Sequence, residues 1–220
     1  MLFAKFILAS TVEFLSFFIF AMVLFRFSVK EALLKFIIAS LIFSFVSNTL
    51  QVESLQNISP LVNIFLFVFL ITIILRVRLL HSIVMVAITF VAFSLVQWLL
   101  LTIFLKAHLF NEILPYTNNG FALQLSTALT LCIISAFIFM TNGGFSYIQS
   151  SSRFYKETFK GNRLFFLFLL LALLEIILVN IFYLASVDLP YYIYFVSITI
   201  MIILVLLIYF SIRKDGRRDT

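Results

Sequence analysis

The chain has 220 residues, of which 64% are hydrophobic and 11% are charged, and its formal net charge is +6. Soluble domains carry about 25% charged residues, so this composition excludes a water-soluble fold and predicts a protein that lies in a lipid bilayer. The apolar runs are continuous and do not alternate with polar residues, which favours transmembrane helices over a β-barrel. We therefore expect an all-α, polytopic helix bundle. The basic charge does not predict nucleic-acid binding, because it lies at the ends of apolar segments.

Seven segments are long enough to cross a bilayer, which needs roughly 20 apolar residues per helix. In chain order these segments are 2–25, 32–50, 60–75, 80–105, 120–140, 164–185 and 190–212. The first is interpreted as a retained helix, since its apolar run is longer than that of a signal peptide and contains Glu13. The predicted domains are a seven-helix transmembrane domain over 1–212 and a basic cytoplasmic tail over 213–220.

The basic residues alternate between the two sides of this predicted bundle. With the N-terminus outside, 13 of the 15 Lys and Arg residues lie on the cytoplasmic side, and only Lys5 and Lys106 lie outside. Short loops rich in Lys and Arg stay in the cytoplasm. The third and fourth segments are separated by a tight cytoplasmic turn at Arg76 and Arg78, with His81 expected at the membrane interface. We expect a multi-pass plasma-membrane protein with its N-terminus outside and its C-terminus in the cytoplasm.

Polar side chains inside the predicted helices are the candidates for a binding site. Glu13 and Glu175 fall near the middle of the first and sixth segments, and charged residues at this depth usually face the bundle interior. Gln97, Gln124 and Asn180 lie in the outer halves of their segments, as the topology places them. These five residues predict an outward-opening polar cavity. The alternative is that they only form hydrogen bonds between neighbouring helices.

The longest predicted loop, 141–163, mixes aromatic with basic residues. It is expected to lie on the anionic inner leaflet, or else to bind a cytoplasmic or membrane protein partner. Gly143 and Gly144 are interpreted as the end of the fifth helix, since a phosphate-binding loop has more widely spaced glycines. No enzyme motif is present, and Cys132 lies deep in the fifth segment, away from both His residues. His108 and Glu112 alone fall short of a metal site, so we expect neither catalysis nor a cofactor.

The architecture resembles one known family. Phe/Ile/Leu-rich helices, short loops and the basic turns FRFSVKE (25–31) and RVRLLH (76–81) are similar to the membrane sensor region of peptide-pheromone receptor histidine kinases of the quorum-sensing AgrC type. The resemblance implies signal transduction in response to an extracellular peptide. The kinase part of that family, with its phospho-accepting His, has no counterpart in this sequence.

Two further functions stay open beside a non-enzymatic sensor or accessory protein. One is a small transporter, or a membrane subunit of one, in which Glu13 and Glu175 carry protons or a cation. The other is a structural subunit whose helices only pack against another protein. The lack of helices broken by Gly or Pro argues against the transporter.

Overall fold

The computed structural model describes residues 2–52, 59–109, 116–146, 148, 167, 170, 171, 174, 198, 199, 201–210 and 212. Within these ranges all regular secondary structure is helical, which confirms the predicted all-α class. The elements are α1 (Leu2–Leu24), α2 (Val29–Val52), α3 (Ser59–Leu75), α4 (Leu79–Lys106) and α5 (Asn118–Met140). A further apolar helical segment covers Met201–Phe210.

Four of these helices are long and apolar enough to cross a membrane: Phe3–Leu24, Val29–Leu50, Leu79–Lys106 and Asn118–Met140. The helix α3 is equally apolar but has 17 residues. Such helices indicate a membrane protein. The bounds of α1 to α5 agree with the first five predicted segments to within three residues at each end. Most of the sixth and seventh predicted segments, and the basic tail, lie outside the described residues.

Helices α1, α4 and α5 end in the same local geometry. The residues Arg26, His108 and Asn142 each adopt a left-handed conformation two positions after a helix ends, with φ of 56°, 53° and 49°. In each case the next N–H bonds back to a carbonyl five residues earlier, at 2.8 Å, 3.1 Å and 2.9 Å. This is the Schellman arrangement, which satisfies terminal carbonyls. The break between α3 and α4 also begins with a left-handed residue, Arg76, at φ 52°.

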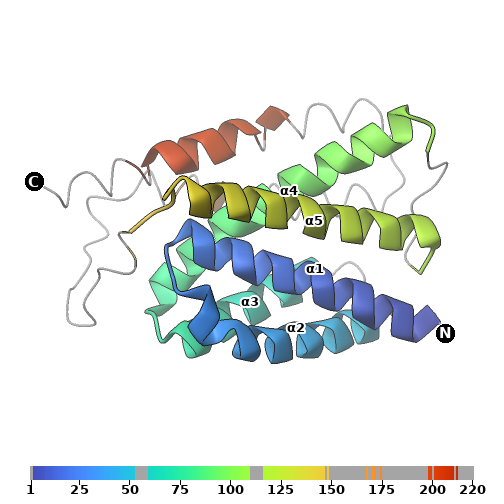
Figure 1. Cartoon of the computed structure of the whole chain (residues 1–220), viewed down its shortest axis with the longest axis horizontal. Coiled ribbons are helices and arrows are strands. Elements are labelled where there is room, and N and C mark those ends of the chain that lie inside the picture. Colours follow the sequence, from blue (N-terminus) through green and yellow to red (C-terminus); the bar gives the residue numbers. More distant parts are fainter. Residues whose placement is uncertain are drawn as a thin grey trace, which may run out of the picture.

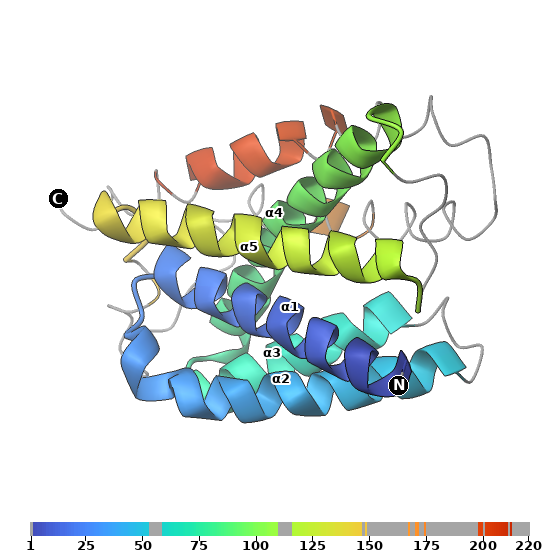
Figure 2. The same cartoon turned by 45° about the vertical axis from the view of Figure 1, so that its right-hand side comes forward.

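Helix α1 lies at the centre of the bundle and contacts α2, α4 and α5. Figures 1 and 2 show α1 and α5 side by side and starting at the same end, with α4 crossing behind them. We call the end at which α1 and α5 begin the outer end, following the predicted topology. Six residues separate α2 from α3, and three separate α3 from α4. Since such short connections cannot run back along a helix, α3 runs inward like α1, whereas α4 runs outward.

At the inner end, the segment after α5 is fastened to the end of α1. The Arg26 side chain donates hydrogen bonds to the carbonyls of Asn142 (2.6 Å) and Gly143 (3.1 Å). The Phe145 N–H donates to the Leu24 carbonyl at 2.7 Å. The rings of Phe25 and Phe145 lie 5.6 Å apart. We call this contact between residues 24–26 and 142–145 the clasp.

The clasp requires glycine at one position. Gly144 has φ of +95°, and a Cβ there would lie 2.7 Å from the Leu24 carbonyl oxygen. Gly143, in contrast, would place a Cβ no closer than 3.4 Å to its neighbours. The helix α5 ends at Met140, so the prediction that this glycine pair follows the end of the fifth helix is confirmed. The close backbone approach explains why the second glycine is needed.

Candidate functional site: a polar layer above an aromatic floor

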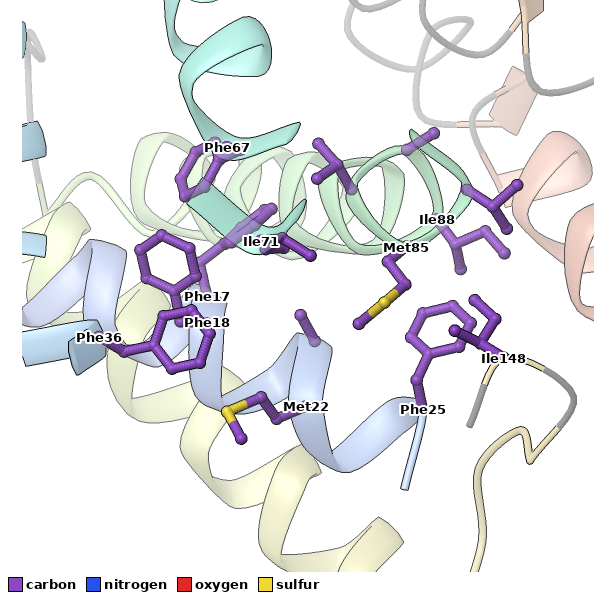
Figure 3. Close-up of a cluster of buried hydrophobic side chains, with 14 of the residues drawn as sticks. Phe17, Phe18, Met22, Phe25, Phe36, Phe67, Ile71, Met85, Ile88 and Ile148 are labelled. Carbon is purple, nitrogen blue, oxygen red and sulfur yellow. The ribbon is translucent and has the colours of Figure 1, made fainter. Parts of the chain in front are cut away.

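Four phenylalanine rings from different helices meet in the middle of the bundle. The ring of Phe67 on α3 stacks on Phe17 of α1, with centroids 4.0 Å apart, and on Phe43 of α2 at 4.2 Å. Phe93 of α4 meets Phe17 edge-on at 5.9 Å. Figure 3 shows Phe17 and Phe67 within the wider cluster of buried hydrophobic side chains. We call Phe17, Phe43, Phe67 and Phe93 the aromatic floor.

A polar residue lies four positions from a floor ring, toward the outer end, on each of three helices. These residues are Glu13 on α1, Asn63 on α3 and Gln97 on α4. Four residues are about one helical turn, or roughly 6 Å along the axis, and share one face of a helix. Because the floor rings touch one another, we infer that residues one turn outward on the same faces lie at a similar depth. We call Glu13, Asn63 and Gln97 the polar layer.

The polar groups of this layer are withdrawn from solvent. Glu13 is 5% exposed. Its backbone carbonyl accepts a hydrogen bond from the Ser16 hydroxyl at 2.7 Å. The Asn63 side-chain oxygen is buried without a partner. Gln97 is half-buried. The layer therefore holds a buried acidic group and an amide oxygen without a hydrogen-bond partner among the described residues.

Gln124 lies at the edge of this layer, between α1 and α5. Its amide nitrogen donates a long hydrogen bond of 3.5 Å to the hydroxyl of Ser10, which is 1% exposed. Its side-chain oxygen is buried without a partner. Ser10 precedes Glu13 by three residues on α1, so the two residues are neighbours on one face of this helix. Ser10 is the one nearer the outer end.

The structure buries Glu13 and places the Gln124 amide against Ser10 of the same helix. It also places the Phe93 ring, four residues before Gln97, against Phe17, four residues after Glu13. Glu175 and Asn180, which were predicted to share the site, lie outside the described residues. Asn63 was not predicted as a site residue, because a position near the outer end of a span is also typical of the headgroup region. The signal that identifies it is its spacing of four from Phe67, which matches Glu13 with Phe17 and Gln97 with Phe93.

Polar residues away from the layer have other surroundings. His81 is 3% exposed and lies in the first turn of α4, which begins at Leu79. Its place at the membrane interface stays a prediction. At the outer rim the Tyr116 hydroxyl donates to the Asn48 side chain at 3.0 Å, and burial raises the pKa of Tyr116 above its ordinary value. Cys132, on α5, is exposed at the surface of the bundle.

No group of three or more potential metal ligands lies among the residues that the structure describes. No family model, curated protein or solved structure matches the chain. The resemblance to AgrC-type sensors therefore stays a prediction. The case for a function rests on the geometry of the polar layer.

Proposed function

We propose that this chain is a multi-pass plasma-membrane protein of seven helices that binds an extracellular peptide or small amphipathic ligand in its polar layer. It acts as a non-enzymatic sensor or accessory protein. The N-terminus lies outside and the C-terminus in the cytoplasm. Glu175 and Asn180, from the sixth predicted helix, complete the site formed by Glu13, Gln97 and Gln124.

One observation carries the proposal: the acidic side chain of Glu13 is 5% exposed in the bundle interior, and two other helices bury the amide oxygens of Asn63 and Gln124. Acidic groups inside membrane helices are costly and usually serve a function. A purely structural role would have them bonded to neighbouring helices, yet the Asn63 and Gln124 side-chain oxygens have no partner. An incoming ligand would supply the missing donors.

The clasp supports the signalling half of the proposal. Helix α1 carries Glu13 at one level and is fastened at its inner end to the segment that opens the loop 141–163. A ligand that shifts α1 relative to α5 would therefore move the start of this loop. The loop in turn contacts the inner leaflet or a partner protein. Such a shift requires that the ligand bind the two arrangements with different affinity.

Access from outside is the first test. In a Cys132→Ser background, Asn63→Cys and Gln97→Cys are treated on intact cells with a membrane-impermeant maleimide. The matched controls are Phe65→Cys and Leu99→Cys, two residues further along the same helices, whose native side chains are 69% and 46% exposed at the bundle surface. The proposal predicts labelling of the layer and none of the controls, which face lipid. Equal labelling within each pair would contradict it.

Transport is the rival that a buried Glu13 also favours, and a flux measurement separates the two functions. The parent protein and the Glu13→Gln variant are each purified, reconstituted in liposomes and tested for proton and cation uptake. Uptake that disappears in the variant would replace the sensor proposal with the transporter. The sensor proposal predicts the same background leak for both proteins.

The seven-helix topology has its own test. Reporter tags that are active only in the cytoplasm are fused after residues 26, 52, 77, 108, 142 and 187, and at the C-terminus. The proposed topology predicts activity after 26, 77, 142 and the C-terminus, and none after 52, 108 and 187. Activity after 187 would remove the sixth or the seventh helix from the account.

A further inference from the structure

The unused polar atoms around the layer are hydrogen-bond acceptors. The Glu13 carboxylate accepts hydrogen bonds once it ionises, and a neighbouring positive charge favours its ionised form. The unpartnered side-chain atoms of Asn63 and Gln124 are both oxygens, and the Gln124 amide nitrogen is already directed at Ser10. A ligand that satisfies this set must bring donors.

The aromatic floor closes the layer on its inner side. The rings of Phe17 and Phe67 lie one turn below Glu13 and Asn63, and Phe67 stacks on both Phe17 and Phe43. The floor offers Glu13 no polar partner, so an ionised carboxylate at this place attracts a positively charged group and repels an anion.

The described part of the chain places no cation of its own at this depth. Lys5 and Lys106, the basic residues nearest the outer end, are both exposed. Lys5 precedes Glu13 by eight residues, about 12 Å along the helix, and Lys106 follows Gln97 by nine, about 13 Å. A counter-charge for Glu13 would come from a bound ligand.

We propose that the polar layer binds an ammonium group, carried by a peptide or by an amphipathic amine. The ammonium donates to the Glu13 carboxylate and the Asn63 side-chain oxygen, with the floor rings beneath it. This inference rests on the proposed function and deepens it, since it fixes the charge of the group that enters the site.

Charge selectivity is measured with a reporter thiol in the layer. Gln97→Cys in a Cys132→Ser background is treated from outside with two impermeant methanethiosulfonates, one carrying trimethylammonium and one carrying sulfonate. Rates are divided by those at Asn118→Cys, an exposed position at the start of α5. We expect a preference for the cationic reagent of about tenfold, the size of effect that one unpaired charge produces at short range in a protein.

Two substitutions assign the preference to Glu13. Adding Glu13→Gln is expected to bring the normalised ratio close to unity. Adding Glu31→Gln, an exposed acid in the first turn of α2 at the inner end, is expected to leave it unchanged. A ratio that survives Glu13→Gln would overturn the assignment of charge recognition to this carboxylate.

A second measurement keeps Glu13 intact, so it does not depend on whether Glu13→Gln folds. Hexylammonium and hexanoate, at equal concentration, are tested for protection of Gln97→Cys against a neutral impermeant maleimide. The inference predicts protection by hexylammonium alone. Protection by hexanoate, or by neither compound, would overturn it while leaving outside access intact. If no reagent labels the layer at all, the proposed function fails first.

Discussion

Replacing Phe67 by Ala would remove the ring that joins the aromatic floor. Phe67 is 2% exposed, and its centroid lies 4.0 Å from Phe17, 4.2 Å from Phe43 and 5.1 Å from Phe18. Each aromatic pair contributes about 0.5–1.5 kcal/mol beyond area burial. Phe→Ala in soluble cores costs about 3–5 kcal/mol, but part of that is transfer from water. The transfer part is largely absent in lipid, so we expect a loss of about 2–4 kcal/mol.

The matched control is Phe65→Ala, on the same helix, because the Phe65 side chain is 69% exposed at the bundle surface. Both variants are unfolded reversibly with SDS in bicelles, and the free energies of unfolding are compared with that of the parent protein. The structure predicts a large loss for Phe67→Ala and a loss of less than about 1 kcal/mol for Phe65→Ala. Equal losses would refute the claim that the floor is a packed interior.

The remaining predictions concern the helix contacts around the site. Gly144→Ala is expected to destabilise the bundle by about 1–3 kcal/mol because of its positive φ and the contact with α1, whereas Gly143→Ala is expected to be near neutral; SDS unfolding that ranks them otherwise would refute the clasp. Thr11 and Ser44 share a hydrogen bond of 2.9 Å between α1 and α2, so a double-mutant cycle of Thr11→Val and Ser44→Ala is expected to give a coupling of about 0.6 kcal/mol, and zero coupling would contradict the bond. Tyr116→Phe is expected to remove the hydrogen bond to Asn48, which stabilises the fold while the Tyr116 hydroxyl is protonated. Because burial raises the pKa of Tyr116 above its ordinary value of 10.0, this stability is complete below pH 10.0 and is lost as the pH rises through the raised pKa. The thermal midpoint of Tyr116→Phe would therefore fall less between neutral and alkaline pH than that of the parent protein, and an equal fall would contradict the prediction.

The helix ends were predictable because charge and chain-breaking residues mark them. Arg26 lies two residues after the end of α1, and Arg76 directly follows α3. The pair Gly143 and Gly144 follows the end of α5. Apolar length then fixes each helix between these marks. The same reasoning identified Glu13 as an interior residue from its depth alone, and the structure places it at 5% exposure.

The floor was not predictable, because the inward and lipid-facing sides of a membrane helix are equally apolar. Phe65 and Phe67 are the same residue type two positions apart, yet one is 69% and the other 2% exposed. Only the packing of α3 against α1 and α2 distinguishes them. For the same reason, the depth of Asn63 relative to Glu13 depends on helix register, which no single segment specifies. The burial of His81 likewise depends on neighbouring helices.

The central claim is that side chains from α1, α3 and α4 converge in one polar layer. Its most direct test is cross-linking of Asn63→Cys with Gln97→Cys, in a Cys132→Ser background, by a short bifunctional thiol reagent. Packed helix axes lie about 8–10 Å apart, and α3 contacts α4, so the account predicts efficient cross-linking of this pair. It predicts little for Asn63→Cys with Leu99→Cys, since Leu99 is exposed at the bundle surface. Equal cross-linking of the two pairs, or none in either, would contradict the account.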